Sequence, residues 1–384
     1  MNAVPLKLLL VAGARPNFMK VAPIVEALRQ RQKAGAQVSL KLVHTGQHYD
    51  ALMSDAFFAD LGIPQPDINL NVGSGSHAEQ TARVMLHFEP VCLAERPDWV
   101  MVVGDVNSTL ACALTAVKLH IAVAHVEAGL RSGDRGMPEE INRLCTDAVS
   151  DLLFTTDELA DENLLRENIP PGRISRVGNT MIDTLYRNLA RARALPLPEG
   201  VRPAEFAVLT LHRPRNVDNR DTLAGLMEAI VRISRRIRVL FPVHPRTRRN
   251  LEDFGLMAPL AANENLVLMP PLGYLAFLGL VCRAKMVLTD SGGIQEETTV
   301  LGIPCITMRE NTERPITCTM GTNVLTGADP GRVESAASTV LGGAAPSGRV
   351  PHLWDGHAAE RIADALLARG GWSPAHSTAE MLAG

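Results

Sequence analysis

The stretch IAVAHVEAGLRSGDRGMPEEINR, residues 121–143, joins an apolar run, a charged loop and a segment with helical character. The run over 121–126 has the continuous apolar character of a strand buried in a parallel sheet. Met137-Pro138 then introduces a helix, because proline is favoured in the first helical turn, and Glu139 and Glu140 follow it directly. This strand, loop and helix form one unit of an α/β fold.

The same unit recurs along the whole chain. Six apolar runs precede residue 192 and six follow residue 205, and all twelve predict strands: 6–12, 38–44, 98–103, 121–126, 152–156, 174–178, 206–212, 237–244, 265–271, 284–290, 303–308 and 322–327. Between the two sets, ARALPLPEGVRPAE (192–205) has three prolines and no regular period, which indicates a linker. We therefore predict two doubly wound α/β domains, 1–191 and 206–354, that face a central cleft. A final helix within 355–384 is expected to pack back on the first domain.

Length and composition exclude several classes of protein. The 384 residues are 46% hydrophobic and 21% charged, as expected of a globular chain with two cores. A net charge of −3 provides no basic field for a nucleic acid or an anionic membrane. Six scattered cysteines without a CxxC pair predict neither disulfides nor a zinc site, and we expect them reduced in the cytoplasm. The N-terminal apolar run is too short to span a membrane, so no targeting segment is expected.

Two loops after strands have the residues of anion sites. GARPNFMK (13–20) carries Arg15 and Lys20, with Pro16 in the first turn of the next helix, although both cations could instead pair with surface carboxylates. In SGGIQEE (291–297), Ser291 can cap a helix, and Gly292 and Gly293 let the backbone approach a ligand closely. Free N–H groups at such a helix start suit a phosphate or diphosphate.

Three further polar residues lie at the ends of second-half strands. Glu297, expected in the first turn of its helix, suits hydrogen bonding to ribose hydroxyls, although a carboxylate there could only stabilise the helix dipole. His212 and His244 each end a strand and precede an arginine. Phosphate contact is the favoured interpretation for His212 and a weaker one for His244, and no ligand spacing supports a metal at either histidine.

The first half brings acids to its strand ends. Asp105 in GDVNST (104–109) precedes a helix that Asn107 or Ser108 can cap, and Glu127 and Glu139 follow the next strand. Three acids at one sheet edge suit proton transfer at a sugar carbon, because different surroundings can make one an acid and another a base. The arginines of this stretch, Arg131, Arg135 and Arg143, are expected to limit the repulsion among the acids. A solvated, salt-bridged loop would explain the same charges without any chemistry.

These residues resemble the non-hydrolysing UDP-N-acetylglucosamine 2-epimerases. The resemblance covers essentially the whole chain and rests on GARPNFMK, HTGQHYD, GDVNST, HVEAGLRSGD, MPEEINR, VGNTMID, LTLHRPRN, TDSGGIQEE and ENTERP, in the family's order. It implies the glycosyltransferase-B type of fold, two Rossmann-like domains around a cleft, and commonly a homodimer. It also implies that neither a cofactor nor a metal is needed.

The resemblance implies a mechanism and a site. The family removes the proton from carbon 2, expels UDP by anti elimination, holds a 2-acetamidoglucal and adds UDP back while a proton returns to the opposite face. The implied catalytic residues are Asp105, Glu127, Glu139 and His212. The implied substrate-binding residues are Arg15, Lys20, Arg131, His244, Tyr274, Phe277, Ser291, Gly292, Gly293, Glu297 and Arg314, with Tyr274 and Phe277 in the uracil-contacting segment PLGYLAF (271–277).

Several points leave the exact activity open. Many members have HRREN or HRAEN where this chain has His212-Arg213-Pro214-Arg215-Asn216, so a carboxylate that could orient the histidine is missing. A related sugar such as a 2,3-diacetamido uronic acid derivative fits the same motifs. The sequence is also compatible with a hydrolysing epimerase, a glycosyltransferase or a nucleotide-sugar sensor, and the clustered acids count against the sensor.

The resemblance also raises the question of a second, activating UDP-sugar. The segments that correspond to that site are GQHYDALM (46–53), which adds Tyr49 and Asp50, and LNVGSGSHAEQ (70–80), which has no Arg or Lys. A second diphosphate would meet an added carboxylate and fewer cations, so we expect an enzyme that works without this activator.

Overall fold

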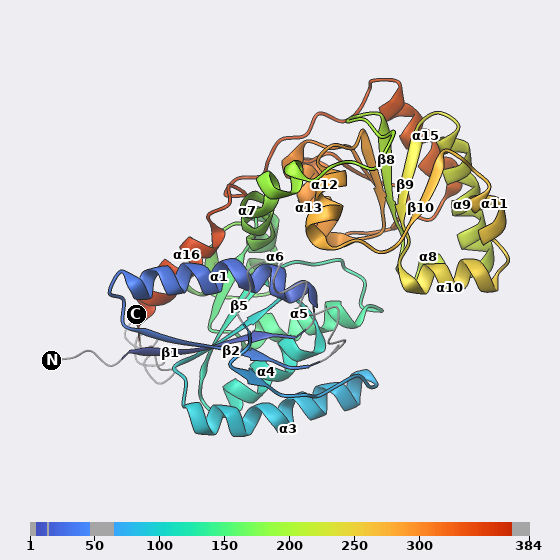
Figure 1. Cartoon of the computed structure of the whole chain (residues 1–384). Helices are drawn as coiled ribbons and strands as arrows, with labels where there is room; N and C mark the ends of the chain where they lie inside the picture. The colour runs from blue at the N-terminus through green and yellow to red at the C-terminus, as the bar shows by residue number, and fades with distance from the viewer. Residues whose placement is uncertain (1–4, 14, 47–64, 371–384) are drawn as a thin grey trace. The chain divides into compact units, whose positions relative to one another are not determined.

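The computed structural model describes residues 5–13, 15–46 and 65–370 (Figure 1). The chain divides into two compact units. Unit 1 comprises Met1–Thr184 with His352–Gly384, and unit 2 comprises Leu185–Pro351. Each unit is an open parallel sheet with helices on its faces, as the recurring apolar runs predict.

The described residues of unit 1 form a seven-stranded sheet in the order β3-β2-β1-β4-β5-β6-β7. Its strands are β1 (Leu6–Ala12), β2 (Val38–His44), β3 (Ile68–Asn69), β4 (Trp99–Val103), β5 (Ala122–Ala128), β6 (Leu152–Thr155) and β7 (Ile174–Arg176). Its helices are α1 (Arg15–Lys33), α3 (His77–Glu95), α4 (Asn107–Lys118), α5 (Pro138–Val149), α6 (Glu158–Arg166), the 3-10 turn η1 (Pro171–Arg173), the first residues of α7 (Thr180–Ala194), and α16 (Ala358–Arg369). The strand order reverses between β1 and β4, and ligands of such sheets bind at the carboxyl ends of the strands beside this switch point.

Unit 2 repeats the design with six strands in the order β10-β9-β8-β11-β12-β13. The strands are β8 (Phe206–Thr210), β9 (Arg238–Pro242), β10 (Leu266–Met269), β11 (Met286–Thr289), β12 (Cys305–Thr307) and β13 (Asn323–Leu325). The helices are α8 (Pro214–Val217), α9 (Arg220–Ser234), α10 (Pro245–Asp253), α11 (Met257–Ala261), α12 (Tyr274–Val281), α13 (Gly292–Leu301), α14 (Ile316–Thr319) and α15 (Pro330–Leu341). Here the order reverses between β8 and β11.

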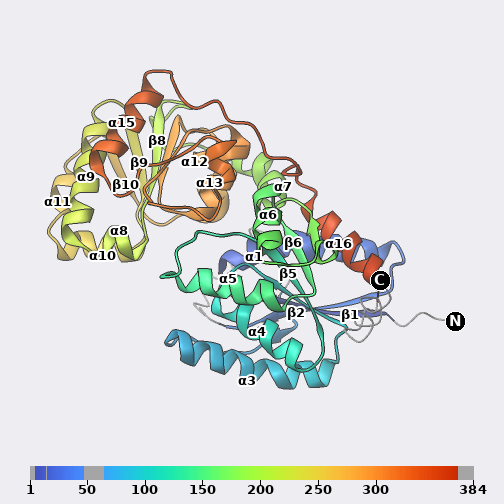
Figure 2. The same cartoon turned by 180° about the vertical axis from the view of Figure 1, so that it is seen from behind.

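Strand alternation distributes the apolar side chains of unit 1 to two cores. Leu8 and Leu10 pack with α1 and α16 on one face of the sheet. Leu9 and Val11 pack with α3 and α4 on the other face. Both views show α16 alongside α1, although the two helices are far apart in sequence (Figures 1 and 2). The C-terminal helix is thus part of the first unit's core.

Two expectations about the chain's organisation need correction. All twelve expected strands form, but β3 is an additional strand, since its two residues carry no apolar run. The expected linker begins too early, because residues 192–194 are the end of α7, and the division between units falls at Thr184 inside that helix. The Arg-Ala repeat before Pro196 continues the helical period, and irregular structure starts only near the first proline.

Within the described ranges no helix is long and apolar enough to cross a membrane. The same part of the chain contains no group of His, Cys, Asp and Glu side chains arranged to hold a metal ion.

Candidate functional site

Glu127 lies in a bulge at the carboxyl end of β5. The pairing of β5 with β6 shifts register between Val126 and Ala128, and Glu127 has a φ of 69°, which a non-glycine residue rarely adopts. Such strain concentrates at functional positions. The buried Glu127 carboxylate forms an ion pair with the buried Lys20 ammonium of α1. The first turns of α1 and the carboxyl end of β5 therefore meet at this ion pair.

Asp105 reaches the same place from β4. It follows Gly104, whose φ is 73°, and a Cβ at Gly104 would lie 3.1 Å from Asn17 Nδ2 and 3.6 Å from Glu127 Oε2. The backbone before Asp105 thus packs directly against the Lys20–Glu127 pair. Asp105 itself forms an ion pair with Arg143 of α5.

The helix after Asp105 begins differently from the expectation. Val106 occupies the N-cap position without a side-chain cap, and Asn107 is the first residue of α4. The Asn107 side chain instead contacts Gln80 through a hydrogen bond of 2.8 Å and accepts one of 3.2 Å from Asn142. Asn142 also donates to the Asp105 carbonyl at 2.9 Å, so α5 holds both the backbone and the side chain of Asp105.

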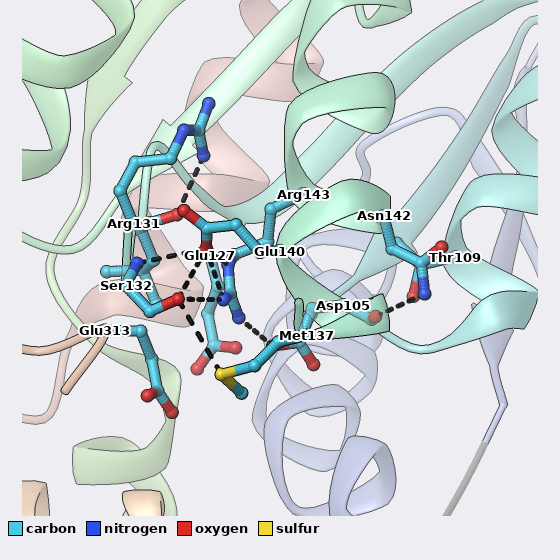
Figure 3. Close-up of polar contacts among 12 residues, drawn as sticks. Asp105, Thr109, Glu127, Arg131, Ser132, Met137, Glu140, Asn142, Arg143 and Glu313 are labelled. Carbon is cyan, nitrogen blue, oxygen red and sulfur yellow. Dashed lines mark hydrogen bonds and ion pairs between the residues drawn. The ribbon is translucent and has the colours of Figure 1, made fainter. Parts of the chain in front are cut away.

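The two adjacent glutamates of α5 have different surroundings. Glu140 is buried and accepts hydrogen bonds from the N–H and hydroxyl of Ser132 and from the N–H of Gly133, besides its ion pair of 2.5 Å with Arg143 (Figure 3). Burial alone would raise the Glu140 pKa, but these donors outweigh it and hold the pKa below its usual value. Glu139 is half-buried, and within the described part of the chain no hydrogen bond or ion pair engages its carboxylate. Glu139 is therefore the one available for proton transfer.

Only one of the three arginines between residues 131 and 143 has its expected role. Arg143 of α5 lies between Asp105 and Glu140 and forms an ion pair with each (Figure 3). Arg131 does not contact the expected acids. It forms ion pairs with Asp147 at 2.7 Å and Glu167 at 2.6 Å, because its side chain extends towards the far part of α5 and the end of α6. Arg135 is exposed.

In unit 2, His212 is held by a buried acid that sequence analysis did not single out. Asp290, directly after β11, lies 2.9 Å from His212 Nδ1 and accepts the backbone N–H groups of His212 and Arg213 at 3.0 and 2.8 Å. Burial would raise the Asp290 pKa, but His212 and the N–H donors lower it below its ordinary value. A carboxylate at position 215 is therefore not needed to orient His212. Asp290 itself stands in the motif TDSGG, where its position directly after a strand could have identified it from the sequence.

His244 lies next to His212 but has a capping role. The two rings have their centroids 5.6 Å apart. His244 is the N-cap of α10, where its Nδ1 accepts the Arg246 N–H at 3.2 Å, so the proton of the neutral ring is on Nε2. Partial burial and the neighbouring His212 lower the His244 pKa. The Nε2–H group remains as a donor.

The start of α13 has the form of an anion site. Ser291 occupies the N-cap position, but its side chain makes no capping hydrogen bond, in contrast to the expectation, so the first N–H groups of the helix lack a side-chain cap. A Cβ at Gly292 would lie 2.8 Å from Glu313 Oε1 and 2.9 Å from Arg314 Nη1, so glycine is required where Arg314 packs against the helix start. Gly293 follows in the same turn.

Arg314 belongs to a buried ionic chain beside this helix. Its Nε lies 2.5 Å from Glu296, and its guanidinium also pairs with Glu313, which in turn pairs with Arg309 at 2.7 Å. Burial opposes ionisation of Glu313, yet the two arginines hold the Glu313 pKa well below its usual value. These ion pairs hold Arg314 beside Gly292.

Glu297 is in the second turn of α13 and not the first, because the helix begins at Gly292. Its buried carboxylate accepts the Tyr274 hydroxyl at 2.9 Å. Burial raises the Glu297 pKa to about 7, against the opposing effect of Tyr274. Phe277, on the same helix as Tyr274, packs partly buried against the sheet core. The expected ribose and uracil residues thus lie together on α12 and α13.

Some residues expected at the functional sites are not among those that the structure describes in full. The side chain of Arg15 is not described, although the residue is the first of α1. Residues 47–53 of the expected activator segment also lie outside the described residues.

Comparisons with known proteins identify the family of this chain. A family model for UDP-N-acetylglucosamine 2-epimerase matches residues 30–367. The UDP-N-acetylglucosamine 2-epimerase of Methanocaldococcus jannaschii is 44% identical over 346 residues, which are 88% of this chain and 92% of that protein. A UDP-2,3-diacetamido-2,3-dideoxy-D-glucuronate 2-epimerase of Pseudomonas aeruginosa is 42% identical, over 88% of this chain and 93% of that protein.

A solved structure extends the likeness to three dimensions. The Methanocaldococcus jannaschii UDP-GlcNAc 2-epimerase in complex with UDP-GlcNAc and UDP superposes with a TM-score of 0.85 at 42% identity, covering 94% of this chain and all of that chain. The motifs, the two parallel sheets and these matches agree, and the chain belongs to the UDP-N-acetylglucosamine 2-epimerase family.

Proposed function

We propose that this protein reversibly converts UDP-N-acetylglucosamine to UDP-N-acetylmannosamine by epimerisation at carbon 2. The observation that carries the proposal is the pair of carboxylates at the ends of β4 and β5. Asp105 and Glu127 are each ion-paired with a buried cation, Arg143 and Lys20. Family membership and a relative solved with UDP-GlcNAc bound support the substrate.

The reaction proceeds by elimination and addition. A carboxylate takes the proton from carbon 2, the bond from carbon 1 to the diphosphate oxygen breaks, and its electron pair leaves with UDP. The remaining sugar is 2-acetamidoglucal, with a double bond between carbons 1 and 2. UDP then adds back to carbon 1 while an acid delivers a proton to the opposite face of carbon 2. Atoms and charge balance without any further reactant.

The acid-base roles fall to Asp105, Glu127 and Glu139. Carbon 2 has no adjacent carbonyl to acidify its proton, so the barrier must be lowered mainly by stabilising the leaving diphosphate. Ser291, Gly292 and Gly293 at the start of α13 and the fixed guanidinium of Arg314 supply the donors for that charge.

The remaining residues hold the nucleotide and the sugar. His212, oriented by Asp290, and the Nε2–H group of His244 are phosphate donors. Glu297 accepts the ribose hydroxyls, and Tyr274 and Phe277 border the uracil. Lys20, Arg15 and Arg131 are assigned to the phosphates and sugar by the family's motifs, and the ion pairs of Arg131 favour an indirect part for it.

Proton exchange with solvent tests the mechanism. The purified protein is incubated with UDP-GlcNAc in heavy water, and NMR follows the hydrogen at carbon 2. We expect UDP-ManNAc that carries one solvent deuterium at that carbon. Product that retains the original hydrogen would rule out the elimination route.

A second candidate substrate has specific support. The 42% identical Pseudomonas aeruginosa relative is named for a UDP-2,3-diacetamido uronate. Comparing kcat/KM for this compound and for UDP-GlcNAc decides between them, and a preference of at least about tenfold for the uronate would replace the proposal. Release of free ManNAc with UDP would identify a hydrolysing enzyme.

We also propose that the enzyme is a cytoplasmic homodimer that supplies polysaccharide biosynthesis. The family resemblance supports a dimer, and Leu86 and Leu93, seven residues apart on α3, are 67% and 60% exposed. Exposed leucines two turns apart on one face of a helix suit a protein contact. Light scattering should give twice the mass of 41.4 kDa, and Leu86→Glu with Leu93→Glu should give the monomer.

A further inference from the structure

The strand β5 contains one polar side chain whose two ends are both engaged. His125 is fully buried, with apolar neighbours on both sides in the strand. Its Nε2 lies 2.8 Å from the Gly104 carbonyl, and its Nδ1 lies 2.6 Å from Asp147 Oδ1. A carbonyl can only accept, so Nε2 carries a proton and donates to Gly104. His125 therefore connects the residue before Asp105 to helix α5.

Asp147 connects the same helix to the residues after Glu127. Its second oxygen accepts the Gly129 N–H at 3.0 Å and pairs with Arg131 at 2.7 Å. Burial would raise the Asp147 pKa, but His125, Arg131 and the Gly129 N–H outweigh burial and lower it. Asp147 is thus a carboxylate with a donor on each oxygen.

These contacts join two closely packed backbone segments. A Cβ at Gly129 would lie 2.4 Å from the Ala160 carbonyl oxygen, so the chain after Glu127 is pressed against α6. The Gly104 N–H donates to the Val126 carbonyl at 3.0 Å, and its own carbonyl accepts from His125. Asp105 and Glu127 are therefore carried by segments tied to each other and to one helix.

We propose that His125 and Asp147 are a positioning pair for the proposed epimerisation, fixing the separation and direction of Asp105 and Glu127. Anti elimination needs the proton-transferring groups at defined places around one carbon. A displacement of about 1 Å can cost roughly a hundredfold in rate. Neither residue of the pair touches the reacting atoms, so the pair acts through the two carboxylates.

Two substitutions separate this role from simple loss of stability. In Asp147→Asn, the amide group keeps one acceptor and loses the other, so either His125 or Gly129 loses its contact. In His125→Gln, the side chain can donate to Gly104 or to Asp147 but not to both. The control is Asp183→Asn, which alters a buried carboxylate of the same unit that accepts the Ala358 and Ala359 N–H groups at the start of α16.

We expect Asp147→Asn and His125→Gln each to lower kcat at least tenfold with KM changed less than threefold, and the double variant to lose little more than either. Asp183→Asn should keep wild-type kcat. Equal kcat in wild type and both variants, or an equal loss in the control, would overturn the positioning role. If Asp147→Asn does not fold, His125→Gln decides by the same criterion.

Hydrogen exchange gives a readout independent of activity. We expect faster amide exchange at 103–107 and 127–131 in Asp147→Asn and His125→Gln, whereas Asp183→Asn should change exchange only around 355–360. A wild-type chain that turns over no UDP-sugar would count against the proposed function alone, while unchanged exchange at both segments would count against the pair.

Discussion

At the scale of single residues, the pair Glu139 and Glu140 shows how neighbours can divide structural and chemical roles. The Glu140 carboxylate accepts hydrogen bonds from Ser132 and Gly133 and pairs with Arg143, whereas Glu139 has no such donors in the described part of the chain. We expect Glu139→Gln, like Asp105→Asn and Glu127→Gln, to lose at least about a hundredfold in turnover while UDP still binds. Glu140→Gln should instead lose about 3 kcal/mol of unfolding free energy, because Arg143 keeps its charge. Turnover assays, UDP calorimetry and urea unfolding distinguish the two patterns, and wild-type turnover in Glu139→Gln would contradict the assignment.

The orientation of His212 provides a second residue-scale prediction. Asp290 holds the ring and two backbone N–H groups, while Arg215, at the position of the missing family carboxylate, is exposed. Asp290→Asn removes the charge partner, so we expect kcat to fall at least about tenfold. Arg215→Ala should remain within about twofold of wild type. The reverse order in steady-state kinetics would show that position 215, and not Asp290, controls the histidine.

We expect Glu297 to make the stability of unit 2 depend on pH. Its pKa rises from an ordinary 4.5 to about 7 through burial, so between these values the folded state binds more protons than the unfolded state. Stability from this group is therefore complete at low pH and falls by about 3 kcal/mol as pH rises through 7. Glu297→Gln lacks this titration. Its unfolding free energy relative to wild type should increase from pH 5 to pH 8, and a constant difference in urea titrations would contradict the raised pKa.

At the scale of elements, the strands were predictable and the polar links between them were not. Most strands are largely apolar runs, so their places in the sequence are visible without the fold, but β3 has two residues and leaves no such signal. The acids after β4 and β5 could be placed because parallel strands end at one edge. The buried acids behind them could not be placed. Asp147 holds Gly129 from the far part of α5, and Asp290 follows a strand distant in sequence from His212.

The attachment of α16 is an element-scale feature open to test. His357 at its N-cap makes no side-chain cap, and Asp183 of α7 accepts the Ala358 and Ala359 N–H groups at 3.1 and 2.7 Å instead. Replacing a capping carboxylate usually costs about 1 to 2 kcal/mol. We expect Asp183→Ala to lower the unfolding free energy of unit 1 by this amount with kcat unchanged. A fall in kcat at full stability would show that α16 affects the reaction directly.

At the scale of the whole molecule, the proposed acid-base residues and the proposed UDP-binding residues of α12 and α13 belong to different units. The acids belong to unit 1 and the residues proposed to hold UDP at α12 and α13 belong to unit 2. The two domains are predictable because the apolar runs restart after residue 205. The boundary inside α7 is not, because a helix that passes from one unit to the other keeps its period throughout.

Separate cores predict separate unfolding. Each unit has its own clusters of buried apolar residues, so calorimetry should resolve two transitions, of which Asp183→Ala lowers only that of unit 1. A ligand that binds only the folded state adds about 2.7 kcal/mol of stability at a hundred times its Kd. Because Ser291, Glu297 and Arg314 all lie in unit 2, UDP at that concentration should raise the other transition more than the one identified by Asp183→Ala. If both transitions rise equally, UDP binding depends on unit 1 as much as on α13, and the assignment of UDP to unit 2 is wrong.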